Sequence, residues 1–171
     1  MKNIFSKSRI WTIVLILATL LAGCSADSAD VMLTCPFTEA AWDYDFTAID
    51  ALEGGDTESY DSVYGGMTYT YPKEYMDKSG TIKYMFDGND KLASVAWTYS
   101  SEDADEVMIL YKNIYAAISD EFGKSSTEDG VQNYSEIWKR PEEGNIILSS
   151  VLTGDLKAVQ IAFLHPSVSH E

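Results

Sequence analysis

Apolar and polar residues alternate in two stretches of the chain that lie 64 positions apart. A period of two is typical of a half-buried β-strand. The positions that recur with this spacing are Gly80/Gly144, Ile82/Ile146, Leu92/Leu156, Val95/Val159, Trp97/Ile161 and Tyr99/Phe163. Residues 87–90 and 153–155 interrupt the two patterns with Gly, Asn and Asp, which tolerate the backbone of a tight turn. We therefore predict two β-hairpins of one design.

A helical pattern and one further strand precede each hairpin. Asp45 is a suitable N-cap for a short helix that presents Phe46, Ile49 and Leu52 on one face and stops at Gly54. A strand is predicted from residue 67 to 72 in the first copy and from 134 to 138 in the second.

The second helix is longer. It is capped by Ser100 with Asp103 or by Asp103 with Glu106, and Gly123 occupies the position of a C-terminal cap. Its apolar positions recur at helical spacing: Val107, Leu110, Tyr111, Ile114, Ile118 and Phe122.

The resulting element order is αβββ followed by αβββ. One such unit is too small to bury a core of its own, so we expect both to share one domain. The predicted fold is α+β, a tandem repeat with two helices packed on one face of a largely antiparallel sheet. The domain is expected over residues 39–164, its halves over about 39–99 and 100–164, and a flexible tail over 165–171.

The N-terminus has the layout of a secretory signal peptide. Lys2, Lys7 and Arg9 precede an apolar run, Ile10–Leu21. As a helix this run would be about 18 Å long, whereas the core of a bilayer is roughly 30 Å thick. The run is therefore too short for the alternative, an uncleaved helix that spans the membrane. The run closes with Leu21-Ala22-Gly23-Cys24.

This ending resembles the lipobox of bacterial lipoproteins. The resemblance implies that residues 1–23 are removed and that Cys24 carries a covalent diacylglycerol with fatty acyl chains such as palmitate. Residues 24–38 would then be the lipidated cysteine and its tether. We expect a protein anchored by lipid in the cell membrane or outer membrane and facing outside the cytoplasm, with the membrane as its first partner. Ser25 is not the aspartate associated with inner-membrane retention.

Charge narrows the range of partners. Removing residues 1–23 takes away three positive charges, so the formal charge moves from −15 to −18 over the remaining 148 residues. Such a chain is unsuited to nucleic acid, whose phosphates require clustered Lys and Arg. It suits cations or a basic protein partner, although a merely solvated acidic surface would have the same charge.

Candidate catalytic and metal-binding residues are few. With Cys24 lipidated, Cys35 is the one cysteine left, and nothing basic near it in sequence would activate a thiolate. His165 and His170 lie in the tail at a spacing that is not that of a zinc site. Acidic groups at 87–90 and 102–106 are explained by a turn and by helix capping. We expect no enzyme, no metal site and no cofactor apart from the lipid.

Aromatic residues are the strongest candidates for binding. The aromatic residues at alternating strand positions include Tyr69, Tyr71, Trp97 and Trp138. Side chains at alternating positions point to the same face of the sheet, so these residues either pack in the core or lie on an exposed sheet face. If exposed, they would anchor a protein partner in the envelope, because Tyr and Trp dominate binding hot spots. The alternative is a small ligand, a glycan stacked on the rings or a cation held by acidic loops.

The helix segment Phe46–Gly54 (FTAIDALEG), followed by a tyrosine-rich strand and a hairpin, resembles two groups of small αβ domains. They are the SmpA/OmlA family of outer-membrane assembly lipoproteins and the β-lactamase inhibitory proteins. The resemblance covers most of residues 40–164 as a pattern and carries over no functional residue. It implies the tandem architecture and a non-catalytic role as a tethered adaptor or inhibitor.

Overall fold

The computed structural model describes residues 33–127 and 135–169, all within the structural unit Val31–Glu171. Cys24 and the predicted signal peptide, and His170 in the predicted tail, lie outside these residues. Among the described residues, no helix combines the length and the apolar character needed to cross a membrane.

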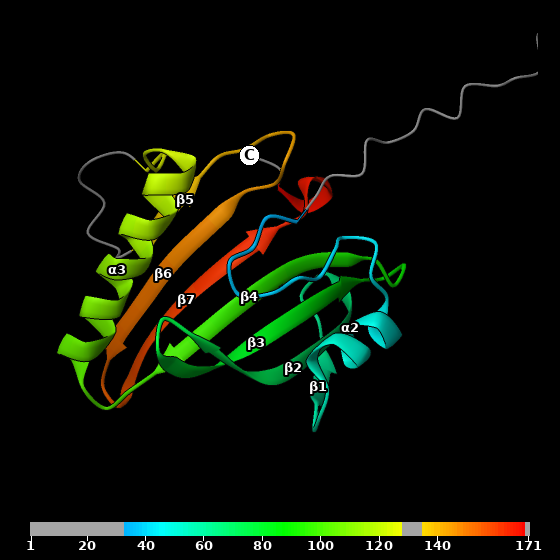
Figure 1. Cartoon of the computed structure of the whole chain (residues 1–171), viewed down its shortest axis with the longest axis horizontal. Helices are drawn as coiled ribbons and strands as arrows, with labels where there is room; N and C mark the ends of the chain where they lie inside the picture. The colour runs from blue at the N-terminus through cyan, green and yellow to red at the C-terminus, as the bar shows by residue number, and fades with distance from the viewer. Residues whose placement is uncertain (1–32, 128–134, 170–171) are drawn as a thin grey trace, which may run out of the picture. The chain divides into compact units, whose positions relative to one another are not determined.

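Within this part of the chain, two α-helices accompany seven strands that form one antiparallel sheet (Figure 1). This agrees with the expected α+β class. The elements are α2 (Phe46–Glu53), β1 (Glu58–Asp61), β2 (Gly65–Tyr75), β3 (Lys78–Asp87), β4 (Leu92–Ser100), α3 (Ala104–Phe122), β5 (Ser135–Trp138), β6 (Ile146–Thr153), β7 (Leu156–Leu164) and the 3₁₀ turn η1 (Pro166–Val168). The strand order is β1-β2-β3-β4-β7-β6-β5.

Both helices begin and end where capping residues stand. Asp45 accepts a hydrogen bond from the backbone N–H of Ala48, and Gly54 closes α2 at a φ of 61°. Asp103 accepts from the N–H groups of Asp105 and Glu106 at the start of α3. Of the two caps considered for α3, the one centred on Asp103 is therefore confirmed.

The strand β1 and the length of β2 differ from the prediction. The sequence predicts no strand over Glu58–Asp61, and it ends the next strand at Pro72, whereas β2 continues to Tyr75. The pair of residues between β1 and β2 that lies nearest to Pro72 is Glu58 with Thr70, so β1 does not reach Pro72. The missing proline N–H therefore costs no hydrogen bond to a neighbouring β1.

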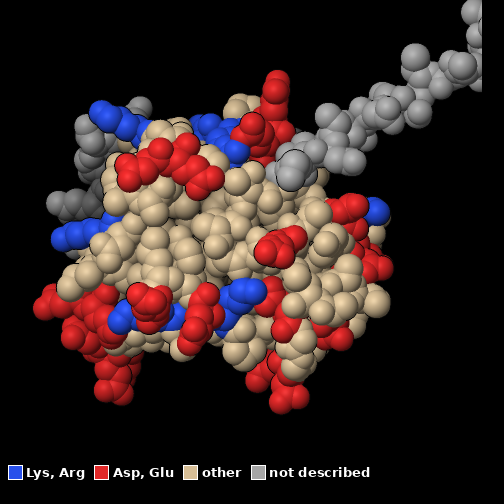
Figure 2. Space-filling model, viewed as in Figure 1, with Lys and Arg blue, Asp and Glu red and all other residues tan. Residues whose placement is uncertain are grey.

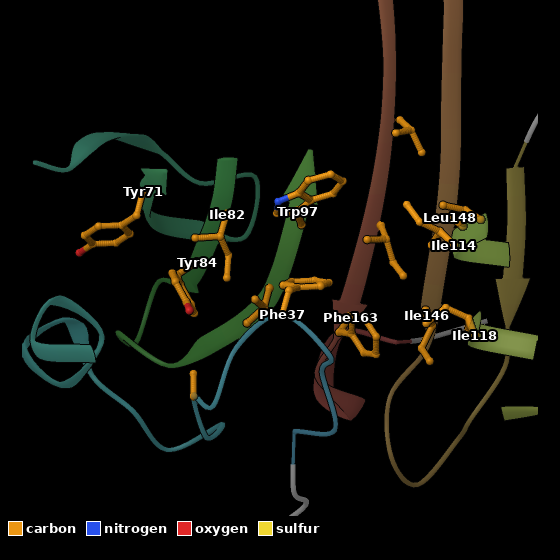
Figure 3. Close-up of a cluster of buried hydrophobic side chains, with 14 of the residues drawn as sticks. Phe37, Tyr71, Ile82, Tyr84, Trp97, Ile114, Ile118, Ile146, Leu148 and Phe163 are labelled. Atoms are coloured by element: carbon orange, nitrogen blue, oxygen red, sulfur yellow. The ribbon is translucent and has the colours of Figure 1, made fainter. Parts of the chain in front are cut away.

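The core lies on the sheet face that holds the odd-numbered positions of β4 and β7. A row of paired residues crosses the centre of this face, because Ile82 pairs with Trp97, Trp97 with Ile161, and Ile161 with Leu148. All four side chains are buried, and Figure 3 labels Ile82, Trp97 and Leu148 among them. The helix α3 contacts β6 and β7, and its Ile114 and Ile118 point into the same cluster (Figure 3).

The segment before α2 is part of the core. Phe37 is buried, with its ring centroid 5.4 Å from that of Tyr75 and 5.7 Å from that of Phe163 (Figure 3). Ala40 and Trp42 are buried as well. The packed domain therefore begins before residue 38, the boundary expected for the tether, because Phe37 buries its ring in the sheet.

Candidate functional site

Three of the four predicted aromatic anchors are core residues. Tyr71, Trp97 and Trp138 are only 1%, 0% and 2% exposed. Their polar tips are also satisfied inside the domain. Trp97 Nε1 donates to the carbonyl of Lys73 at 3.0 Å, and Trp138 Nε1 donates to that of Gly123 at 2.8 Å. The prediction that these three form an exposed binding surface is therefore wrong, because strand register turns them toward the core.

The opposite face of the central strands carries polar and aliphatic residues instead. Across the central pair of strands, Ser94 opposes Leu164, Ala96 opposes Ala162, and Thr98 opposes Gln160. Because none of these six side chains is aromatic, they do not make the flat aromatic surface that the prediction required.

Tyr69 is the exception among the four, and it lies at a surface pocket. It is half-buried, and its ring stacks on Phe46 with centroids 4.2 Å apart and an interplanar angle of 28°. Phe86 makes an edge contact with it at 5.8 Å. The pocket has a volume of about 280 Å³ and is lined by Asp45, Phe46, Thr47, Met67, Tyr69, Phe86 and Asp90. We call it the Tyr69 pocket.

Capping and turn geometry place the side chains of the Tyr69 pocket. Phe46 follows the N-cap Asp45, so the first turn of α2 presents it above β2, and 39% of it remains exposed. Asp90 comes from the turn between β3 and β4, where it adopts a φ of 57°. Asp tolerates this left-handed conformation better than most residues. Two separate segments thus bring a carboxylate to one pocket.

The Tyr69 pocket has an excess of negative charge. Asp45 and Asp90 both line it, and none of its described lining residues is Lys or Arg. Neither carboxylate belongs to an ion pair among the described residues. Asp45 uses one oxygen on the N–H of Ala48 at 2.9 Å. The pocket therefore offers aromatic rings and carboxylate oxygens together.

A second group of polar side chains is buried beneath α2. Oε1 of Glu53 accepts a hydrogen bond of 2.5 Å from the Tyr84 hydroxyl, and Oε2 lies 2.8 Å from Nζ of Lys73. Burial, followed by this bond to a carboxylate, raises the pKa of Tyr84. The arrangement has a single carboxylate whose partners are all internal, so it suits packing rather than acid–base chemistry.

A broader groove separates the tip of the β2–β3 hairpin from the start of α3. It has a volume of about 530 Å³ and is lined by Met76, Lys78, Asp103, Asp105, Glu106, Ile109, Leu110 and Asn113. Lys78 pairs with Glu106 across it at 2.5 Å. Figure 2 shows acidic side chains gathered around the start of α3. Asp103 caps the helix, as the capping interpretation predicts, whereas the Glu106 side chain forms this ion pair, which the sequence pattern did not predict.

The described residues that could act as nucleophiles or metal ligands do not form a site. Burial raises the pKa of the Cys35 thiol, which keeps it protonated and poorly nucleophilic. Nδ1 of His165 lies 2.7 Å from the Ser167 hydroxyl within the C-terminal turn. Asp87 accepts from the N–H groups of Asn89 and Lys91 and so shapes its turn. No group of three or more His, Cys, Asp or Glu residues suited to a metal ion occurs in the part of the chain described.

The residues that sequence reasoning missed are Phe46, Asp45 and Asp90 as a group. The sequence pattern places Phe46 on one face of its helix with Ile49 and Leu52, but only Ile49, at the centre of that face, is fully buried. The sequence did contain one usable signal. A helix of two turns has a narrow buried stripe, so the apolar residues at its edges stay partly exposed.

Comparisons with known proteins return no match for this chain: no family model, no curated protein and no solved structure is similar to it at a significant level.

Proposed function

We propose that this protein is a non-catalytic bacterial lipoprotein that binds a protein partner outside the cytoplasm, as an adaptor or an inhibitor. The lipobox-like ending at Cys24 supports the anchor. The observation that carries the binding role is the Tyr69 pocket, where Phe46 keeps 39% of its surface exposed while stacking on Tyr69. Rigid aromatic side chains at a pocket mouth are the usual anchors of protein interfaces.

We also propose that the fold is a tandem αβββ repeat with both helices on one sheet face. The strand order supports it, since β4-β3-β2 and β7-β6-β5 run outward from a central β4–β7 pair. The 64-residue spacing places Trp97 and Ile161, which pair directly, at equivalent positions. On this view β1 is an addition to the first copy. A relation to the SmpA/OmlA family or to the β-lactamase inhibitory proteins would require this same tandem architecture.

The length of the tether supports a partner in the envelope. Leu33, which packs against the core, lies nine positions after Cys24. A fully extended chain of that length spans at most about 30 Å. A domain held by a lipid on Cys24 would therefore work close to its membrane, within reach of other envelope proteins.

The Tyr69 pocket is large enough to receive one side chain of a protein. Pockets that enclose a whole ligand usually measure about 300 to 1,000 Å³, and the Tyr69 pocket, at about 280 Å³, lies at the lower end of that range. The second candidate, a glycan or cation ligand, rests on the same aromatic rings and carboxylates. Titration of the protein with Ca²⁺ and with cell-wall oligosaccharides tests it separately.

Site-specific photocrosslinking in the native cells tests the proposed function. We place a benzophenone amino acid at Thr47, which is exposed and lines the pocket, and at Val151 on β6 as a control. A discrete crosslinked partner is expected from position 47 only. Phe46→Ala should reduce its yield roughly tenfold, as for an interface anchor, whereas Leu156→Ala, on an exposed apolar residue outside the pocket, should not.

Equal crosslinking from positions 47 and 151, or a yield that Phe46→Ala leaves unchanged, would overturn the proposed docking surface. Circular dichroism of each variant shows that the domain remains folded, so that lost crosslinking reports on binding.

A further inference from the structure

We infer that the Tyr69 pocket receives an arginine side chain of the protein partner. The inference rests on the proposed function and adds the chemistry of the partner to it. It is carried by three features of the pocket: its charge, its aromatic rings and its lack of a cation of its own among the described residues.

The charge of the pocket remains negative after the helix dipole is counted. The N-terminus of a helix carries about half a positive charge, and the two carboxylates carry two negative ones. The surplus is therefore roughly one and a half negative charges in a pocket of about 280 Å³. Asp45 offsets the dipole by accepting from Ala48, which leaves Asp90 free to bind a cation.

The aromatic rings select an organic cation over a metal ion. A guanidinium group stacks on aromatic faces while its N–H fork binds carboxylates, and it sheds water more easily than an ammonium group. Divalent metals instead require several oxygen ligands, and the described residues contain no group of three or more His, Cys, Asp or Glu suited to a metal ion.

The protein already binds one of its own arginines in this manner. The guanidinium carbon of Arg140 lies 4.3 Å from the centroid of the Phe122 ring, and the same group pairs with Glu143. A ring face and a carboxylate therefore hold a guanidinium elsewhere in this domain. The Tyr69 pocket has the same two components from Phe46 and Asp90 and lacks the arginine.

The test uses the full chain in neutral detergent and a pair of blocked pentapeptides, Gly-Gly-Arg-Gly-Gly and its citrulline counterpart. Citrulline has almost the same shape as arginine and no charge. Binding is followed by NMR at the Phe46 and Tyr69 rings. We expect the arginine peptide to shift these signals with a millimolar Kd, and the citrulline peptide to bind at least tenfold more weakly.

Two isosteric variants remove the charge and keep the backbone. Asn is a good N-cap and tolerates the left-handed conformation, so Asp45→Asn and Asp90→Asn should preserve the fold. Each should weaken arginine binding severalfold, while Asp155→Asn, in the turn between β6 and β7, should have no effect. Should Asp45→Asn alter α2, Asp90→Asn alone decides the outcome.

Equal binding of the two peptides, or arginine binding that survives both substitutions, would overturn this inference. A tetramethylammonium ion that binds more tightly than the arginine peptide would also overturn it, because the pocket would then select a free organic cation. The proposed function fails separately, by the loss of site-specific crosslinking. If crosslinking of a partner at Thr47 is reduced by Phe46→Ala but not by Asp90→Asn, the proposed docking surface stands and the inference of an arginine side chain is refuted.

Discussion

The Tyr84 hydroxyl donates a hydrogen bond of 2.5 Å to Oε1 of Glu53, the last residue of α2. Since the single proton of Tyr84 is used in this bond, Thr38 Oγ1, 2.6 Å away, donates to Tyr84. Lys73 Nζ reaches the second oxygen of Glu53 at 2.8 Å. The buried carboxylate thus joins the segment before α2, the end of α2 and two strands, and α2 holds the Tyr69 pocket.

Removing this carboxylate should destabilise the domain. Only 3% of the Glu53 side chain is exposed, so Glu53→Ala leaves Tyr84 and Lys73 without their acceptor. We expect the free energy of unfolding to fall by about 2 kcal/mol, measured by urea denaturation. Glu58→Ala, on the exposed edge strand β1, should change it by less than about 0.5 kcal/mol. Equal losses in the two variants would contradict the structural role.

Several tyrosines should ionise late in an alkaline titration. Burial raises the pKa of Tyr75 to about 12 and that of Tyr111 to about 12, above the ordinary value near 10. The folded state then holds protons that the unfolded state releases, so stability is complete below pH 10 and declines as pH rises toward 12. Absorbance at 295 nm measures the ionisation. Tyr75→Phe should remove one late step, and an unchanged titration curve in that variant would refute the assignment.

The ion pair of Lys78 and Glu106 makes a prediction for acid pH. The hydrogen bond from Lys78, helped by Ser101, lowers the pKa of Glu106 to about 2. Stability from this pair is therefore complete above the ordinary carboxyl pKa of about 4.3 and is lost as pH falls toward 2. Carbon NMR of the carboxyl group measures the titration. Lys78→Met should raise the pKa of Glu106 toward its ordinary value; a pKa that stays near 2 would assign the shift to other groups.

Most elements of the fold could be predicted because their signals are local; the edge strand β1, whose four residues are all exposed, has no such signal. Alternation, capping residues and turn residues located both helices and both hairpins. The side of the sheet that each row faces could not be read in this way. Alternation shows that Tyr71 and Trp97 lie on fixed faces of their strands, but only pairing between distant strands decides which face is covered.

The same limit explains why the packed domain begins earlier than predicted and why the pocket was missed. The core residue Phe37 lies in a short segment with no periodicity, so nothing in the sequence marks it as buried. The Tyr69 pocket combines Phe46 with Asp90, which are 44 positions apart and come together only through the sheet. Sites assembled from distant turns carry no local pattern.

The β2–β3 hairpin has a two-residue loop, Met76-Asp77, whose left-handed backbone conformation is adopted more easily by Asn and Gly. Met76 and Asp77 adopt φ angles of 50° and 58°, as in a type I′ turn, where Asn-Gly is preferred. Asp77→Gly should therefore raise the free energy of unfolding by about 0.5 to 1 kcal/mol, measured by urea denaturation. The same change at Asp120, inside α3, should lower it by about 0.5 to 1 kcal/mol. Destabilisation in both variants would mean that Asp77 makes a contact worth more than its backbone strain.

The close approach of Gly80 and Trp97 makes the sharpest prediction for the core. A Cβ at Gly80 would lie 2.5 Å from the indole Cζ2 and 2.6 Å from the carbonyl oxygen of Thr98. The indole cannot retreat without losing its bond to the Lys73 carbonyl and its packing in the core. Gly80→Ala should therefore cost about 1 to 3 kcal/mol and change the near-ultraviolet circular dichroism of the tryptophans. Gly88→Ala, whose Cβ would meet nothing closer than 3.7 Å, is the matched control, and an equal cost there would refute the packing argument.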